Sequence, residues 1–281
     1  MIRVDQLCFS YTKQPFIEDA SFEVEAGEIF GFLGPSGAGK STLQKILTGL
    51  LPRYQGTVLV NGEKAGQHSK SFYEHIGVDF EFPSLYEKLT ARENLKFFAS
   101  LYPKTREINM LLKSVGLLND ADKKVSDYSK GMKSRLNFIK ALLHDPRILF
   151  LDEPTSGLDP SNARVMKDII LEEKSKGKTI ILTTHNMYDA TELCDRVAFI
   201  VDGKIRALDT PHNLIMRRGA LKIAYTYSEN GKEIRADVPL DETSGDEILG
   251  RLIRENRLLS IHSEEPTLND IFLEITGRQL Q

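Results

Sequence analysis

The chain has 281 residues, with 37 Lys plus Arg against 40 Asp plus Glu, which gives a formal net charge of −3. This length suggests one large or two modest domains, and the slightly acidic balance argues against a protein built to coat nucleic acid. Hydrophobic residues make up 41% and charged residues 27%, so the composition is that of a folded globular chain and argues against long disordered or low-complexity stretches.

The sequence shows neither a membrane span nor a secretion signal. No stretch approaches the roughly 18 uncharged apolar residues of a membrane-spanning helix, and the N-terminal residues lack an apolar signal core. Cys8 and Cys194 lie far apart without a CxxC spacing or a nearby histidine pair, as expected for reduced thiols rather than for a zinc site. These features predict a cytoplasmic protein.

The first 62 residues alternate short β-type runs with turns. The runs cover residues 2–9, 20–24, 28–33 and 57–60. The third run is followed by GPSGAGKST and then by apolar residues at helical spacing. This order predicts a strand, a glycine loop and a helix.

The middle of the chain first becomes helical and then returns to strands. Residues 82–143 carry helical patterns, and Thr90 and Glu93 have the spacing of a capping box. Short apolar runs follow at residues 147–152 and 179–184, with a helical segment between them, so we expect these two strands to be parallel. Residues 196–205 predict a hairpin.

The sequence changes character after residue 219. Two β-type runs flank Asn230 and Gly231, a strong hairpin signal, and are followed by a helix from about residue 246, a strand at 257–262 and a capped helix from Thr267. We expect residues 219–281 to form a small accessory α+β domain behind a larger domain at residues 1–218.

The glycine loop satisfies the phosphate-loop pattern GxxxxGK[ST] in its required context, with a strand before it and a helix after it. Glycines let successive backbone N–H groups surround a phosphate chain, and the helix N-terminus adds partial positive charge. Lys40 is expected to reach the β- and γ-phosphates, and Ser41 to offer its hydroxyl to Mg²⁺. The predicted nucleotide-binding residues are Gly34, Pro35, Ser36, Gly37, Ala38, Gly39, Lys40, Ser41 and Thr42.

Two carboxylates, Asp152 and Glu153, end the apolar run at 147–152. Asp152 is suited to hold magnesium, and Glu153 to position or deprotonate an attacking water. Taken alone, such a pair is equally typical of a strand end that meets solvent. Its combination with the phosphate loop favours the catalytic interpretation.

Further segments resemble the motifs of ABC-type ATPases. SKGM at residues 129–132 resembles their LSGGQ signature, and SGLD at residues 156–159 resembles their D-loop. His185 stands where the family has its switch histidine, Glu81 where it has the Q-loop, and Tyr11 where it has an adenine-stacking aromatic. The resemblance covers about residues 1–215, with all segments in the expected order.

The resemblance implies an α/β fold: a P-loop NTPase core with an antiparallel β subdomain and a helical signature subdomain at about residues 82–143. It also implies that two such domains close head to tail around ATP and Mg²⁺. Ser129 and the N–H of Gly131 would then contact ATP held by the partner's Lys40, and His185 would contact the γ-phosphate. The signature and D-loop residues implied to bind nucleotide are Ser129, Lys130, Gly131, Met132 and Asp159.

Simpler structural explanations exist for three of these residues: Ser129 as an ordinary helix cap, His185 as a strand-end histidine and Tyr11 as a surface aromatic. The order of the whole set favours function for all three.

Two positions depart from the family pattern. Glu81 replaces glutamine, which keeps an oxygen ligand for Mg²⁺ but adds negative charge beside the γ-phosphate. Lys130 replaces glycine, so its backbone must keep φ below zero or accept strain, and its ammonium either assists phosphate binding or points into solvent. Two interpretations remain open: tolerated variation with ATPase activity kept, or a slow site in an asymmetric dimer.

The apolar run at residues 82–86 follows the Q-loop directly. In the family this region receives a helix from the membrane subunit, so Phe82, Leu85 and Tyr86 are candidate partner contacts. For Phe82 and Leu85, packing inside the helical subdomain is an equal alternative. Residues 265–274 resemble the tails of export-type ATPase subunits of the multidrug and antibiotic-resistance kind.

We therefore expect an ATP-binding and ATP-hydrolysing subunit of an ABC transporter, of the export type, bound to the cytoplasmic face of the membrane. It would act as a homo- or heterodimer on a separate transmembrane subunit. The alternatives are an importer subunit and a soluble regulatory ABC ATPase that is not coupled to transport. Ribosome- or DNA-directed ABC ATPases are disfavoured, because the chain has one phosphate loop and no heptad insertion.

Overall fold

The computed structural model describes residues 1–67, 69, 71–217, 222–229 and 231–277. These residues form two compact units, one covering Met1–Leu208 and one that begins at Asp209 and includes the C-terminal helix. The expected boundary at residues 218 and 219 falls outside the described residues. The observed division comes earlier, because α7 (Pro211–Met216) packs against α9 (Leu268–Thr276) within the second unit.

The N-terminal strands form an antiparallel sheet of order β2-β1-β4-β5. Buried and exposed side chains alternate along β1 and β2, the pattern of a sheet with one face on the core. At the turn after β4, Asn61 and Gly62 both have positive φ, at 51° and 82°, as a tight hairpin turn requires. The strands are β1 (Ile2–Phe9), β2 (Ile17–Val24), β4 (Gln55–Val60) and β5 (Glu63–Lys64).

A second sheet of six strands, in the order β10-β9-β3-β8-β7-β6, forms the centre of the first unit. β6, β7, β8, β3 and β9 are parallel, which confirms the parallel pairing expected for residues 147–152 and 179–184. β3, β7 and β8 are buried along their whole length, as expected for strands covered on both faces. The strands are β3 (Ile29–Leu33), β6 (Ile76–Asp79), β7 (Ile148–Asp152), β8 (Thr179–Thr184), β9 (Arg196–Val201) and β10 (Lys204–Asp209).

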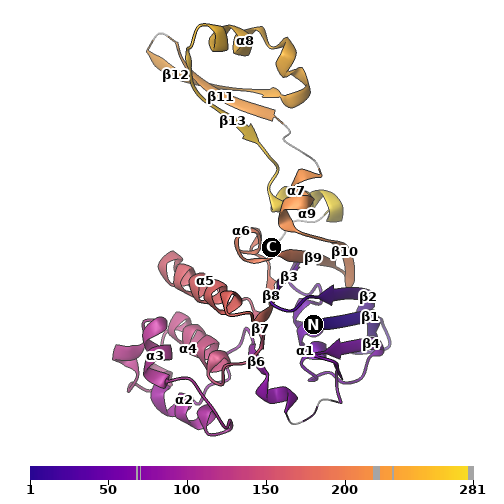
Figure 1. The fold of residues 1–281 in the computed structure, drawn as a ribbon, viewed down its shortest axis with the longest axis vertical. Coiled ribbons are helices and arrows are strands. Elements are labelled where there is room, and N and C mark those ends of the chain that lie inside the picture. The colour runs from indigo at the N-terminus through magenta and orange to yellow at the C-terminus, as the bar shows by residue number, and fades with distance from the viewer. Residues whose placement is uncertain (68, 70, 218–221, 230, 278–281) are drawn as a thin grey trace. The chain divides into compact units, whose positions relative to one another are not determined.

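Helix α1 (Lys40–Leu47) lies between the two sheets (Figure 1). Its apolar residues Leu43, Ile46 and Leu47 join one core cluster with side chains of both sheets, including Phe30 and Val58. Two other helices follow strands of the parallel sheet: α5 (Pro160–Ser175) and α6 (Met187–Leu193). Because parallel strands end at one edge of a sheet, the loops after β3, β7 and β8 meet there.

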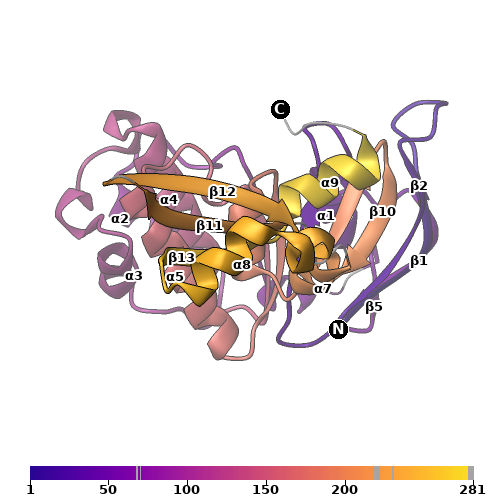
Figure 2. The same cartoon turned by 90° about the horizontal axis from the view of Figure 1, so that it is seen from above.

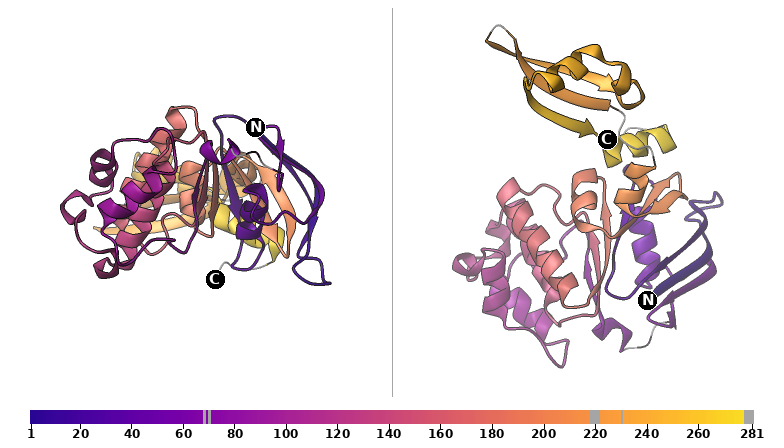
Figure 3. Two further views of the ribbon diagram at one scale, coloured as in Figure 1. Left: turned by 90° about the horizontal axis from the view of Figure 1, so that it is seen from below. Right: turned by 45° about the horizontal axis from the view of Figure 1, so that its top comes forward.

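The helices α2, α3 and α4 form a separate group beside the parallel sheet (Figures 1 and 3). They begin at Ala91, later than the expected residue 82, because Thr90 caps α2 and Pro83 disfavours a helix before it. The Thr90 hydroxyl accepts from the Glu93 N–H at 3.1 Å, and the Glu93 carboxylate accepts from the Thr90 N–H at 2.8 Å, so the predicted capping box is confirmed. The helices are α2 (Ala91–Ala99), α3 (Ile108–Ser114) and α4 (Lys130–Leu142).

The second unit contains an antiparallel sheet of order β12-β11-β13, with α8 over its strands (Figure 2). Leu249 and Leu252 of α8 pack against Tyr225 and Val238 of the sheet. The hairpin, the helix and the capped C-terminal helix expected after residue 219 are all present, although Asn230 lies outside the described residues. The elements are β11 (Lys222–Glu229), β12 (Lys232–Pro239), α8 (Glu247–Arg254) and β13 (Leu258–Glu264).

Within the described ranges, short 3₁₀ helices are also present at Phe72–Glu74, Leu118–Asp120, Val125–Asp127 and Leu240–Gly245. Among the residues that the structure describes, no helix is long and apolar enough to cross a membrane.

A buried network of charged side chains connects the helical group to α5, the helix that follows β7 of the parallel sheet. The side chain of Glu173 is only 2% exposed and accepts hydrogen bonds from Arg106, which precedes α3, at 2.8 Å and from Lys176 at 2.8 Å. The Lys178 ammonium lies 3.1 Å from the same carboxylate. Burial alone would raise the pKa of Glu173, but the hydrogen bonds from Arg106 and Lys176 outweigh it and lower this pKa to about 2.

Replacing Glu173 by glutamine leaves Arg106 and Lys178 without their buried partner. We expect the free energy of unfolding at pH 7 to fall by about 3 kcal/mol, since removing one partner of a buried ion pair strongly destabilises a fold. Because the folded pKa of Glu173 is lowered, its contribution is present above its ordinary pKa of 4.5 and is lost as the pH falls toward about 2. Urea denaturation at pH 7 and pH 3 measures both effects.

Glu172→Gln is the matched control, because the Glu172 side chain is 63% exposed and forms a surface ion pair with Lys176. We expect it to change the free energy of unfolding by less than about 0.5 kcal/mol. Equal losses in the two variants at pH 7 would contradict a structural role for the buried network.

Candidate functional site

Two positions in the loop after β3 have no room for any residue but glycine. A Cβ at Gly34 would lie 2.1 Å from the carbonyl oxygen of Ile200, and one at Gly39, where φ is 112°, would lie 2.5 Å from Ile17. Ser36 and Gly37 at the tip are exposed. The loop therefore presents its backbone to solvent directly in front of α1, the geometry that binds phosphate groups.

Lys40 and Ser41 open α1 behind this loop. Lys40 is buried, and its ammonium donates to the carbonyl oxygens of Gly34 at 2.7 Å and Pro35 at 3.1 Å. Burial lowers the pKa of Lys40. This lowering of the Lys40 pKa is opposed by the negative charges of Glu153, Asp152 and Glu81. All three carboxylates therefore act electrostatically on the Lys40 ammonium.

Asp152 ends β7 and is buried beside the start of α1. Its Oδ1 accepts a hydrogen bond from the Ser41 hydroxyl at 3.1 Å and another from the Thr183 hydroxyl. The structure thus brings together Ser41 and Asp152, two of the three predicted magnesium ligands, the third being Glu81. Sequence reasoning missed Thr183, although the parallel register of β7 and β8 pairs Asp152 with it directly.

Glu153 follows Asp152 with a positive φ of 52°, and its N–H donates to the carbonyl of Thr183 at 3.0 Å. This conformation is uncommon for a residue other than glycine and is held by its surroundings. The carboxylate accepts from the Thr184 hydroxyl at 3.2 Å and lies 2.9 Å from Nδ1 of His185. The predicted catalytic pair is therefore in direct contact, and Thr184 is a second residue that the sequence did not reveal.

Tyr11 lies beside the start of α1. Its hydroxyl is 3.0 Å from the Thr42 hydroxyl oxygen, and its ring meets Phe9 and Phe16 edge-on at centroid distances of 4.7 and 5.3 Å. The residue as a whole is 55% exposed. Tyr11 is thus a partly exposed aromatic residue beside the start of α1, as expected for a side chain that stacks on a base.

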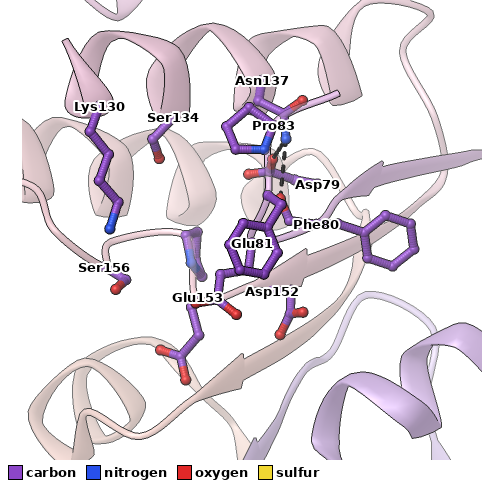
Figure 4. Close-up of a pocket in the computed structure, with 12 residues that line it drawn as sticks. Asp79, Phe80, Glu81, Pro83, Lys130, Ser134, Asn137, Asp152, Glu153 and Ser156 are labelled. Atoms are coloured by element: carbon purple, nitrogen blue, oxygen red, sulfur yellow. Dashed lines mark hydrogen bonds between the residues drawn. The ribbon is translucent and has the colours of Figure 1, made fainter. Parts of the chain in front are cut away.

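A cavity of about 220 Å³ opens between α4 and the ends of β6 and β7 (Figure 4). Glu81 lies in it together with Asp152 and Glu153, and Lys130 extends from the start of α4 toward Ser156 (Figure 4). The lining residues are Asp79, Phe80, Glu81, Phe82, Pro83, Lys130, Ser134, Asn137, Asp152, Glu153, Pro154 and Ser156. Both departures from the family pattern therefore line one cavity.

The signature segment begins α4. Ser129 is its N-cap, with a hydroxyl that accepts from the Met132 N–H at 3.2 Å, and Lys130 keeps an ordinary helical backbone as the first residue of the helix. The ammonium of Lys130 would lie 3.6 Å from a Cβ built on Gly157, so its stem packs over the D-loop of its own chain. Asp159 caps α5 by accepting from the Asn162 N–H at 3.1 Å.

The aromatic run after Glu81 is largely on the surface. Phe82 is 78% exposed, Leu85 is half-buried, and Tyr86 is exposed but packs edge-on against Phe97 at 4.9 Å. The alternative that Phe82 packs inside the helical group is therefore wrong. Among the described residues no cluster of three or more His, Cys, Asp or Glu could hold a metal ion by itself, and both cysteines are free.

The glycine loop lies between β3 and α1, and two acids stand at the end of β7, which is separated from β3 by β8 in the same parallel sheet. This arrangement defines a P-loop nucleoside triphosphatase. Comparison with known proteins narrows this class: the family described as ABC transporter matches residues 17–156. The chain belongs to the ABC transporter family, and it is an ATP-binding subunit with ATPase chemistry.

Three relatives match nearly the whole chain. A fluoroquinolones export ATP-binding protein of Mycobacterium tuberculosis is 49% identical over 100% of this chain and 94% of its own length. The Nod factor export ATP-binding protein I of Rhizobium meliloti is 36% identical over 97% and 87% of the two chains. The linearmycin resistance ATP-binding protein LnrL of Bacillus subtilis is 31% identical over 100% of both.

Solved structures agree with the fold. An ATP-binding subunit of an ABC transporter superposes with a TM-score of 0.71 at 31% identity, over 78% of this chain and 93% of the other. CbiO1 from Clostridium perfringens, described as part of the cbiONQ transporter complex, gives a TM-score of 0.68 at 26% identity, over 78% and 92%. The expected α/β architecture is confirmed.

Proposed function

We propose that this subunit powers export by binding and hydrolysing ATP between two ATPase subunits that are attached to a separate membrane protein. The observation that carries the hydrolytic part is the contact between Glu153 and His185, 2.9 Å apart beside the phosphate loop. The export part is supported by the three relatives named as export or resistance proteins, which match the chain over almost its full length.

The residues of the loop bind the phosphates by exchanging hydrogen-bond partners. The Lys40 ammonium is bonded to carbonyl oxygens of the loop. A β- or γ-phosphate oxygen replaces these carbonyls, because a charged acceptor forms the stronger hydrogen bond. The exposed ring of Tyr11 stacks on the adenine, while its hydroxyl stays bonded to Thr42.

Ser41, Asp152 and Glu81 fit a magnesium ion, because all three offer the oxygen ligands that this hard cation prefers. Two of them already lie together, with the Ser41 hydroxyl 3.1 Å from the Asp152 carboxylate. Magnesium supplies charge neutralisation for the phosphate chain. The role of the protein is to hold these oxygens in place, which Thr183 does for Asp152.

Glu153 orients the attacking water and accepts its proton. Its carboxylate is held in place by the Thr184 hydroxyl and by His185. His185 contacts the γ-phosphate and senses its loss. Ser129 and the N–H of Gly131 complete the site on the ATP of the second subunit, with Lys130, Met132 and Asp159 in the same interface.

Replacing Glu153 by glutamine keeps the size of the side chain but removes the proton acceptor. We expect kcat for ATP hydrolysis to fall by at least about 100-fold, the usual contribution of a general base, while ATP binding is kept. A steady-state phosphate-release assay and equilibrium dialysis with ATP measure the two properties. Glu172→Gln, an exposed glutamate of α5, is the control, and a Glu153→Gln variant with near wild-type turnover would remove Glu153 from its proposed role.

The partner surface is tested at Phe82, whose ring is 78% exposed beside the Glu81 segment. We expect Phe82→Ala to lower recovery of the membrane subunit with tagged protein by about tenfold or more, because a buried aromatic anchor typically contributes 2 kcal/mol or more to an interface. Tyr188→Ala is the matched control, since Tyr188 is 79% exposed elsewhere on this unit. Equal recovery with both variants would place the membrane contact elsewhere.

A further inference from the structure

Two side chains of α4 fasten both ends of the short segment that carries Glu81. At the first end, Asn137 Nδ2 donates to the carbonyl oxygen of Phe80 at 3.2 Å. At the second end, the Lys140 ammonium donates to the carbonyl oxygen of Ser84 at 3.2 Å. The two side chains are also joined to each other, because Lys140 Nζ donates to Asn137 Oδ1 at 2.6 Å. Residues three apart on a helix share one face, so a single face of α4 holds residues 80–84.

The first end is anchored in the protein interior. Asp79, the last residue of β6, is 4% exposed, and Asn137 is 2% exposed. The amide of Asn137 donates to the Asp79 carboxylate as well as to Phe80. The Lys140 ammonium lies 5.0 Å from the centre of the Phe98 ring, a distance typical of a cation–π contact. Buried polar groups that are bonded to one another fix a unique geometry, because any displacement leaves one of them without a partner.

Glu81 lies between the two fastened ends. It lines the cavity of Figure 4 together with Ser134 of α4 and the acids that end β7. We propose that Asn137 and Lys140 are positioning residues, which hold the Glu81 segment against α4 so that Glu81 and the signature residues at the start of this helix move as one body. The inference rests on the proposed function, which gives Glu81 and Ser129 their roles at the nucleotide.

Because a helix is stiff, α4 transmits a displacement from one end to the other. Ser129 caps the first turn of α4, and Asn137 stands about two turns further along the same helix. When a second subunit's ATP engages Ser129, any displacement of α4 is carried by Asn137 and Lys140 to both ends of the Glu81 segment. The carboxylate of Glu81 thereby reaches or leaves its own nucleotide in step with closure of the dimer.

The central variant is Lys140→Met, which keeps most of the apolar stem over Phe98 but removes the bonds to Ser84 and Asn137. Lys140→Arg restores a donor and is the conservative rescue. Lys133→Met is the matched control, because Lys133 lies on the same helix and binds Glu87, outside the segment, at 2.6 Å. Thermal unfolding of each variant shows whether the fold is kept.

The first measurement uses nucleotide-free protein. The chain contains no tryptophan, so Phe82→Trp places a single fluorophore within the segment. We expect the fluorescence anisotropy of this tryptophan to fall when Lys140→Met is added, to return with Lys140→Arg and to stay unchanged with Lys133→Met. The reason is that release of the Ser84 end increases local motion on the nanosecond timescale.

The second measurement is the Mg²⁺ concentration for half-maximal ATPase activity. We expect Lys140→Met to raise it about tenfold, the usual effect of removing a residue that orients a metal ligand, with an unfolding temperature close to that of the wild type. A paired replacement, Asp79→Leu with Asn137→Leu, removes both partners of the interior anchor together, so neither is left without the other. It also removes the bonds that join Asn137 to Phe80 and to Lys140. We expect this paired variant also to lower the anisotropy and to raise the Mg²⁺ concentration for half-maximal activity.

Unchanged anisotropy and Mg²⁺ dependence in both Lys140→Met and the paired variant would overturn the proposal. Glu81→Gln separates this result from failure of the proposed function. If Glu81→Gln leaves the Mg²⁺ dependence unchanged, the assignment of Glu81 to magnesium is wrong, and the anisotropy alone then decides whether Asn137 and Lys140 hold the segment.

Discussion

The parallel register of β3, β8 and β7 is the constraint on which the whole site depends. Leu33 pairs with Thr184, and Asp152 pairs with Thr183, so the glycine loop, the two acids and His185 leave the sheet at one edge. A shift of one residue would turn every side chain of a strand to the opposite face. The Thr183 hydroxyl would then leave Asp152, and Glu153 would lose the contacts that support its positive φ.

The polar groups of the site bind one another. Lys40 is bonded to loop carbonyls, Ser41 to Asp152, and Glu153 to Thr184 and His185. Because buried polar groups need such partners, a phosphate group that binds here takes the place of some of these hydrogen bonds in an exchange. Because the acids would repel a phosphate chain, the exchange depends on the cationic groups and on the loop N–H groups that oppose them.

Local patterns predicted much of this arrangement, since the phosphate loop, the Thr90 capping box and the strand ending at Asp152 are each encoded within a few neighbouring residues. The bonds from Thr183 to Asp152 and from Asn137 to Asp79 join residues 31 and 58 positions apart and arise only from strand register and helix packing. The division before Asp209 has a similar origin, because α7 packs against α9, which lies far along the sequence.

The role of Lys130, which departs from the family pattern, depends on the residues around it. The sequence left two alternatives for its ammonium, the phosphate or the solvent, yet the stem lies across Gly157 and points into the cavity that also contains Glu81. Gly157 has a φ of 71° and no side chain, so it leaves the room that Lys130 occupies. The positive charge of Lys130 and the negative charge of Glu81 thus lie in one cavity. The electrostatic effect of replacing either residue therefore depends on the other.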